Sequence, residues 1–155
     1  MLKETLQEVY QECESSGLFR DQDVTDLEKI KTMMKLSEAN LEFAQSSKDI
    51  DQNSLQWCVI YNLHYDALRE LSHIMILFDR KKIANHRCLF SYLCKNHPEL
   101  DFDWNFLEKI RTKRNGINYY GTPVTKQDFK EIELQVNLYI KTLKNIIKEK
   151  LLVQK

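Results

Sequence analysis

The residues best suited to chemistry lie in one basic, polar stretch, 111–121. On a helix of 3.6 residues per turn, Leu107, Ile110, Arg114 and Ile117 share one face, so Arg114 falls on the stripe that should face the core. A guanidinium at such a position is costly unless it is paired or lies at the mouth of a cleft. We therefore expect Arg114 to meet a partner or a ligand there.

A second polar row borders Arg114 on the same helix. It consists of Arg111, Asn115, Asn118 and Tyr119, with Lys109 and Lys113 at its border. Arginine, lysine and amide side chains together suit the binding of an anion such as phosphate. The alternative is a solvated face, on which Arg114 reaches water or pairs with a carboxylate from a neighbouring helix.

Helices are predicted to position these residues, because the 155-residue chain has only 3 Gly and 2 Pro. Apolar spacing predicts helices over 2–13, from about 25 to 45, over 55–78, around 88–93, over 103–121 and from 125 to the C-terminus. The 55–78 helix is apolar around most of its circumference, which favours a central position. The fold class is therefore all-α: an antiparallel up-and-down bundle of five or six helices in a single domain, 1–155.

The composition excludes a strong electrostatic field of one sign around the whole protein, because Lys plus Arg and Asp plus Glu both number 23. Any nucleic-acid binding must come from a local patch. No apolar run approaches the roughly 20 residues that span a bilayer, and the N-terminus lacks the apolar stretch of a signal peptide. We expect a cytoplasmic protein with no membrane partner.

The four cysteines lie mostly within apolar helical patterns, which is typical of reduced core cysteines; they are Cys13, Cys58, Cys88 and Cys94. A zinc site formed by Cys88, Cys94 and His97 is not favoured, since no fourth ligand lies nearby in the sequence. We expect neither a metal nor another cofactor. No Gly-rich phosphate loop and no paired-carboxylate signature is present.

The pair Arg114-Asn115, followed by an aromatic-rich helix end, resembles the signature helix of HEPN domains. The segment 61–70, Tyr-Asn-Leu-His-Tyr-Asp-Ala-Leu-Arg-Glu, resembles the apolar helix that precedes it in that family, and the resemblance is strongest over 53–150. It implies an up-and-down bundle that is commonly dimeric. Active members are metal-independent, toxin-like ribonucleases that carry Arg, often Asn, and then His within a few residues.

This chain has Tyr119, Tyr120 and Gly121 where the resemblance calls for that histidine. Tyrosine has an ordinary pKa of about 10 and is a far poorer base than imidazole at neutral pH. The resemblance therefore implies a module that is non-catalytic or weakly catalytic. Its candidate catalytic residues are Arg114, Asn115 and Tyr119, and its candidate binding residues are Arg111, Lys113, Asn118, Tyr120 and His86.

Three functions follow from these residues. The first is binding of RNA, a nucleotide or a partner protein. The second is a ribonuclease in which Arg114 acts with a histidine from another helix, His64 or His86, although His64 and His73 lie on the apolar helix where packing histidines are common. The third is a structural homodimer whose partner, by the resemblance, is a nucleotidyltransferase-type antitoxin.

Overall fold

Six α-helices make up most of the chain in the computed structural model, which describes residues 3–46 and 49–154. Their bounds are α1 (Leu6–Ser15), α2 (Leu27–Gln45), α3 (Gln56–Phe78), α4 (His86–Asn96), α5 (Trp104–Tyr120) and α6 (Lys126–Val153), with a 3₁₀ turn at Pro98–Leu100. The all-α prediction is confirmed. No helix within the described ranges is both long and apolar enough to cross a membrane.

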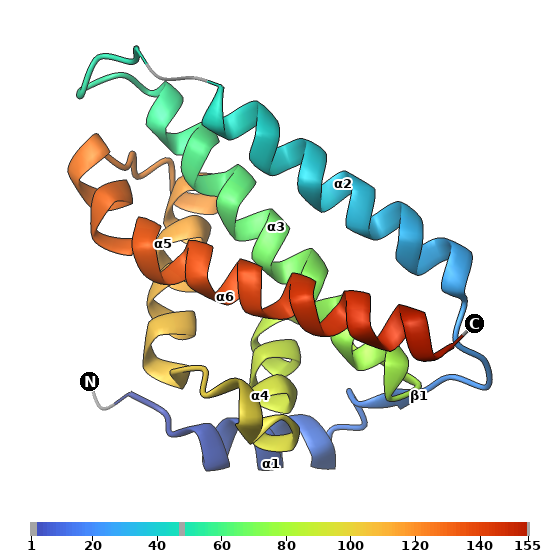
Figure 1. The fold of residues 1–155 in the computed structure, drawn as a ribbon. Coiled ribbons are helices and arrows are strands. Elements are labelled where there is room, and N and C mark those ends of the chain that lie inside the picture. Colours follow the sequence, from blue (N-terminus) through green and yellow to red (C-terminus); the bar gives the residue numbers. More distant parts are fainter. Residues whose placement is uncertain (1–2, 47–48, 155) are drawn as a thin grey trace.

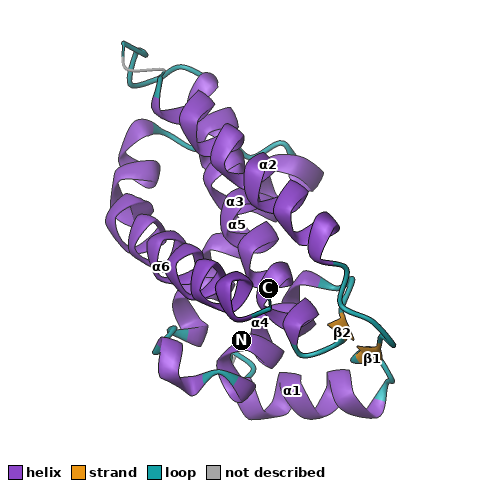
Figure 2. Cartoon of the chain, turned by 45° about the vertical axis from the view of Figure 1, so that its right-hand side comes forward, coloured by secondary structure: helices purple, strands orange, loops and turns teal. Residues whose placement is uncertain are grey.

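Helix α3 lies at the centre of the bundle, as its nearly continuous apolar surface predicts. It packs against α2, α4, α5 and α6. Figure 1 shows α2 and α6 running along α3, while α1 lies across the base beneath α4. The loops before α2 and after α3 also pair as two short antiparallel strands, β1 (Arg20–Asp21) and β2 (Lys81–Lys82), visible in Figure 2. Strands of two residues leave no periodic pattern in a sequence, so they were not predicted.

Helix α5, which carries Arg114, is fixed at both ends by its own sequence. Asp103 caps the N-terminus by accepting hydrogen bonds from the backbone N–H groups of Asn105 and Phe106. Gly121 ends the helix in the left-handed region at φ 63°, which glycine tolerates best. The next helix opens at once with a reciprocal capping box between Thr125 and Asp128.

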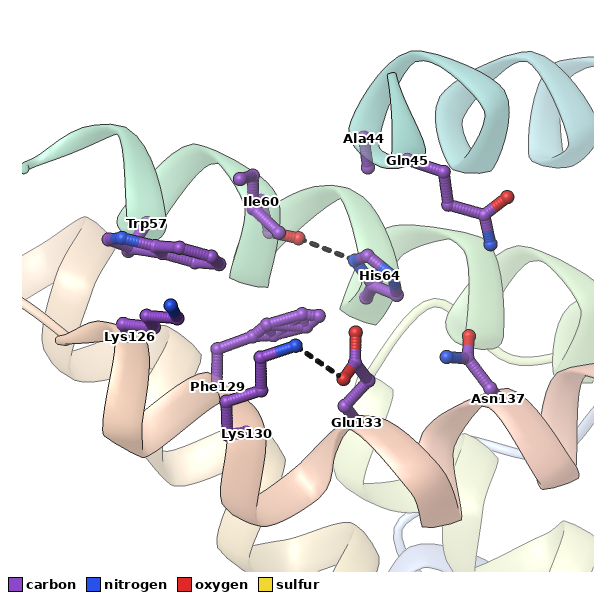
Figure 3. A pocket seen from close by; sticks show the side chains of 10 residues that line it. All are labelled: Ala44, Gln45, Trp57, Ile60, His64, Lys126, Phe129, Lys130, Glu133 and Asn137. Atoms are coloured by element: carbon purple, nitrogen blue, oxygen red, sulfur yellow. Dashed lines mark hydrogen bonds and ion pairs between the residues drawn. The ribbon is translucent and has the colours of Figure 1, made fainter. Parts of the chain in front are cut away.

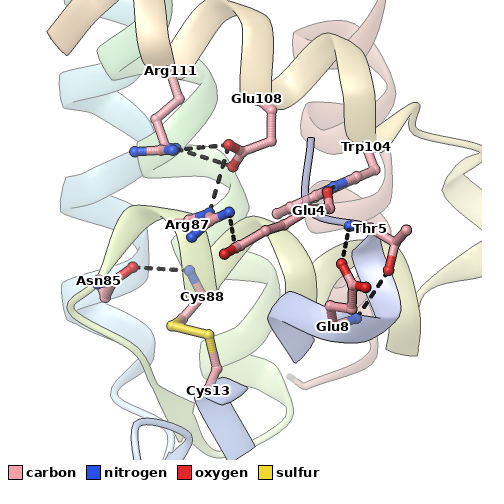
Figure 4. Close-up of polar contacts among 10 residues, drawn as sticks. All are labelled: Glu4, Thr5, Glu8, Cys13, Asn85, Arg87, Cys88, Trp104, Glu108 and Arg111. Carbon is pink, nitrogen blue, oxygen red and sulfur yellow. Dashed lines mark hydrogen bonds and ion pairs between the residues drawn. A yellow bond between two sulfur atoms is a disulfide. The ribbon is translucent and has the colours of Figure 1, made fainter. Parts of the chain in front are cut away.

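The prediction of four reduced cysteines was wrong for two of them. Cys13 on α1 and Cys88 on α4 form a disulfide across 75 residues of sequence (Figure 4). Each cysteine lies on the buried face of its own helix, and periodicity within one helix does not show which distant helix packs against that face. Cys58 and Cys94 are free thiols.

Candidate anion-binding site

Arg114 lies at the edge of the core, on the side of α5 that faces α3. Its side chain is 18% exposed, and the guanidinium carbon lies 5.4 Å from the centre of the buried Tyr65 ring, in cation–π geometry. Its Nη2 atom lies 4.0 Å from Asp66 Oδ1, which is too far for a hydrogen bond. Arg114 is thus positioned as its spacing predicts, with its charge only loosely balanced.

A neutral amide, Asn118, holds the Arg114 guanidinium in place. With its oxygen turned toward Arg114, Asn118 accepts hydrogen bonds from Nε at 2.9 Å and from Nη2 at 3.3 Å. The two residues are one helical turn apart, so they meet on the same face. The other side of the Asn118 amide lies 3.0 Å from the amide of Asn62 on α3. Asn118 therefore orients the arginine without neutralising it.

Two further arginines lie beside Arg114, and we call Arg69, Arg111 and Arg114 the arginine cluster. Arg111 makes two hydrogen bonds to Glu108 on its own helix, Nε to Oε1 at 3.1 Å and Nη2 to Oε2 at 2.8 Å. Arg69, on α3, is 26% exposed and lies 3.4 Å from the carboxylate of Glu70. The Arg69 Nε atom is buried and has no hydrogen-bond partner in the described part of the protein.

His86, the first residue of α4, joins the cluster through Tyr65. The Tyr65 hydroxyl lies 3.2 Å from His86 Nδ1, so Arg114 and His86 contact opposite parts of the same side chain. Burial, followed by the positive charges of Arg69, Arg114 and Arg111, lowers the pKa of His86 to about 4. The imidazole is therefore neutral at physiological pH.

His73 lies on the same side of α3, one helical turn beyond Arg69. Burial, followed by the charges of Lys29, Arg69 and Lys82, lowers its pKa to about 4. Its Nε2 atom is buried and has no hydrogen-bond partner among the described residues. His73 therefore lies partly buried on the apolar helix with one ring nitrogen unpaired in the described part of the chain.

His64 lies in a different part of the molecule. It lines a cavity of about 460 Å³ between α2, α3 and α6, and its ring packs against Phe129 with centroids 4.6 Å apart (Figure 3). Its Nδ1 atom is 2.8 Å from the carbonyl oxygen of Ile60. None of the three clustered arginines lines this cavity. Of the two histidines proposed to act with Arg114, the structure brings only His86 to the cluster.

The other predicted site residues are spread around α5. Asn115 is half-buried, next to Arg114 in the chain. Lys113 lies on the opposite side of the helix, with Nζ 3.5 Å from Asp128 Oδ1. Tyr119 and Tyr120 are 70% and 81% exposed at the C-terminal end of α5. The structure therefore joins Arg111, Arg114, Asn118 and His86 into one site and leaves Lys113 and the two tyrosines outside it.

Sequence reasoning assigned no binding role to the residues that α3 contributes to this site, and it gave His73 only a packing role. Asn62, Asp66, Arg69 and His73 follow one another at i, i+4, i+7 and i+11, which places them on one face of the helix. This polar row on the most apolar helix of the chain was the available signal. Nothing within α3 shows that this row faces the basic stretch of α5, because that contact depends on how the two helices pack.

The site combines cationic and neutral hydrogen-bonding groups with the carboxylates of Asp66, Glu70 and Glu108, which lie beside the arginines. Three guanidinium groups, two neutral imidazoles and two amides line the interface of α3, α4 and α5. Within the described ranges, no group of three or more His, Cys, Asp or Glu side chains is arranged to hold a metal ion. No family model, curated protein or solved structure matches this chain.

Proposed function

We propose that this chain is a HEPN-like RNA-binding module that holds backbone phosphates with the arginine cluster. The observation that carries the proposal is the state of Arg114. The guanidinium is fixed by a neutral amide, and among the described residues no carboxylate oxygen lies within hydrogen-bonding distance of it. A half-buried cation with free donors is suited to a phosphate, because guanidinium groups form paired hydrogen bonds with phosphate oxygens.

The exposure of the cluster and its spread over two helices also favour binding of an extended polyanion. Arg69, Arg111 and Arg114 are 26%, 19% and 18% exposed, so their side chains are held in place and still reach solvent. They come from two helices that pack against each other. Because the chain as a whole carries no net charge, binding depends on this local patch. The resemblance of Arg114-Asn115 to the HEPN signature supports RNA as the ligand.

Titration with a fluorescently labelled single-stranded RNA tests this proposal. Anisotropy should show binding that weakens as salt rises from about 50 to about 200 mM, because phosphate contacts release counterions. Arg114→Gln should weaken binding by about tenfold or more, the value of one charge-assisted hydrogen-bonded contact. Lys35→Gln, on the exposed side of α2, is the matched control and should change nothing. An Arg114→Gln protein that binds as the wild type does would contradict the proposal.

A substitution at Asp66 should strengthen RNA binding, where Arg114→Gln weakens it. Its carboxylate lies 4.0 Å from both Arg69 and Arg114, so it repels an incoming phosphate and accepts no hydrogen bond from either arginine. Asp66→Asn keeps the shape and removes that repulsion. We expect tighter RNA binding by a few-fold, consistent with one partly screened charge at a half-exposed position. Weaker binding would show that Asp66 positions the arginines.

A second candidate function is a metal-independent ribonuclease that uses His86. It is favoured by one observation: Tyr65 contacts both the Arg114 guanidinium and His86 Nδ1, so a phosphate-stabilising group and an imidazole flank the same side chain. In the free protein the pKa of His86 is about 4, which makes it a weak base at neutral pH. This favours binding over catalysis.

Incubation of RNA with the protein in the presence of a chelator separates the two functions. Cleavage that is lost in both Arg114→Gln and His86→Gln would establish the ribonuclease. Intact RNA with wild-type protein, together with measurable binding, supports the binding module. The family resemblance calls for an imidazole at position 119, but Tyr119 lies outside the arginine cluster and is 70% exposed, so Tyr119→His should leave RNA intact.

The homodimer and the nucleotidyltransferase-type partner implied by the resemblance stay predictions. Light scattering on the purified protein measures the mass of the particle in solution and tests the first of them directly.

A further inference from the structure

The cavity between α2, α3 and α6 contains a buried imidazole with one free nitrogen. His64 is 2% exposed and lines this cavity of about 460 Å³, which is within the size range of small-molecule sites. Its Nδ1 atom is 2.8 Å from the carbonyl oxygen of Ile60 and must carry a proton, because a carbonyl oxygen only accepts hydrogen bonds. Its Nε2 atom has no hydrogen-bond partner among the described residues and, unlike Nε2 of His73, is not sealed from solvent. Nε2 of His64 therefore faces the cavity.

This free nitrogen of His64 is a hydrogen-bond acceptor. Burial lowers the pKa of His64, and the hydrogen bond to Ile60 and the charge of Glu133 oppose that shift only in part. The ring is therefore neutral at physiological pH, and with its proton on Nδ1 it keeps a lone pair on Nε2. Water or a ligand that donates a hydrogen bond satisfies an acceptor in this position.

Glu133 on α6 supplies a second acceptor beside His64. The His64 ring packs against Phe129 with centroids 4.6 Å apart, and Glu133 lies one helical turn beyond Phe129. Glu133 Oε1 accepts a hydrogen bond from Lys130 Nζ at 3.0 Å, and Oε2 has no partner in the described part of the chain. Figure 3 shows the carboxylate turned toward the His64 ring, with Asn137 farther along α6. Two acceptors from two helices therefore face the same space.

The charges around the cavity favour an uncharged ligand. Lys130 offsets the charge of Glu133, His64 is neutral, and Lys126 is the remaining charged residue of the lining. A cation would meet this excess positive charge, whereas an anion would bring negative charge against the carboxylate and the imidazole lone pair. Ile60 adds an apolar wall one turn from His64. The lining thus suits an uncharged molecule with hydrogen-bond donors at one end and an apolar body.

We propose that this cavity binds a small uncharged molecule that presents an NH₂ group, such as a primary carboxamide or an amino-substituted ring. The NH₂ group donates hydrogen bonds to His64 Nε2 and to the Glu133 carboxylate, and the body of the molecule lies against Ile60. The amide of Asn137, which also lines the cavity, can donate to a carbonyl or ring nitrogen beside that NH₂ group. The site is separate from the arginine cluster and does not depend on the proposed RNA binding.

Four benzene derivatives of similar size test the ligand class. Benzamide carries the NH₂ group and no charge, methyl benzoate has no donor, benzoate is an anion and benzylammonium is a cation. The ¹⁵N NMR signals of the imidazole give the readout, and loss of a signal in His64→Leu assigns it among the four histidines. In the free protein, Nε2 of His64 should be unprotonated. Benzamide should shift the Nε2 signal saturably and bind about tenfold or more tightly than each of the other three.

A proton on Nε2 in the free protein, or an Nε2 signal that benzamide does not shift, overturns the proposal. Equal binding by methyl benzoate would show that no donor is needed. Equal or tighter binding by benzoate or benzylammonium would show that the site selects a charge. Either of these results also overturns the proposal.

Substitutions in the lining decide whether benzamide binds in this cavity, with binding followed through the ligand's own NMR signals. His64→Leu removes the acceptor and should weaken binding about tenfold, whereas Asn137→Phe fills the cavity and should abolish binding. Glu131→Gln, on the exposed side of α6 and outside the lining, is the matched control and should change nothing. Because Asn137 is only half-buried, Asn137→Phe tests the site even where His64→Leu does not fold. Benzamide binding that survives in a folded Asn137→Phe protein overturns the proposal.

Discussion

Removal of the Cys13–Cys88 disulfide should cost a large part of the stability of the fold. The bond joins residues 75 apart in sequence and therefore restricts the unfolded chain strongly. In the chain-entropy model, closing a loop of about 75 residues contributes about 4.5 kcal/mol to the free energy of unfolding. For a domain of this size, that loss lowers the melting temperature by roughly 9–18 °C.

Thermal unfolding followed by circular dichroism measures this effect in Cys13→Ala, Cys88→Ala and the double variant. All three should lose nearly the same stability, because either single change already breaks the bond. Cys94→Ala, which removes a free thiol, is the matched control and should cost only about 1 kcal/mol. A dithiol reductant should lower the melting temperature of the wild type to that of the variants.

Thiol counting gives the independent check. Of the four cysteines, two are in the disulfide, so the denatured, non-reduced protein should show two reactive thiols, those of Cys58 and Cys94. Four reactive thiols, or additive losses in the single and double variants, would refute the reasoning. Either outcome would mean that packing and polar contacts alone hold α1 against α4.

Two further predictions concern pH. Hydrogen bonds to Asp79 at 2.6 Å and Glu99 at 2.9 Å raise the pKa of buried His97. The protonated imidazole therefore stabilises the folded protein fully below about pH 6.5, and this stabilisation is lost as pH rises through the raised pKa. Urea unfolding should therefore show His97→Gln to be destabilised by about 2 kcal/mol at acidic pH and by less at alkaline pH; an equal loss at both would contradict this account. Burial and nearby cations lower the pKa of His73 to about 4, so the unfolded state binds more protons and stability should fall as pH drops from about 6.5 toward 4. His73→Leu should make stability fall less steeply over this pH range. An unchanged dependence of stability on pH would contradict the role given to His73.

Local signals in the sequence were enough to predict the helices. Apolar spacing over 103–121 and from 125 onward predicted α5 and α6, and in the structure the Asp103 cap, the Gly121 stop and the Thr125 capping box fix ends of these helices within one turn of chain. The apolar surface of 55–78 likewise predicted the central position of α3. These features depend on neighbours in sequence, which is why they could be recognised there.

Contacts between helices were harder to predict. Cys13 and Cys88 meet because α1 crosses the base of the bundle, and no pattern within either helix specifies that crossing. The same holds for His86, which reaches the site through Tyr65 on another helix. For Arg114, spacing along α5 gave its position at the core edge beside Asn118, while its approach to Tyr65 and Asp66 became evident only when α3 and α5 were placed together.

The pKa of His86, measured by NMR in the free and RNA-bound protein, tests the anion-binding site most directly. His86→Gln assigns the imidazole signal. The free protein should titrate with a pKa of about 4, held down by burial and by the three arginines. A phosphate bound at the cluster adds negative charge beside the imidazole and should raise that pKa toward its ordinary value of about 6.5. RNA that binds and leaves the His86 pKa unchanged would show that it binds elsewhere and would contradict the account.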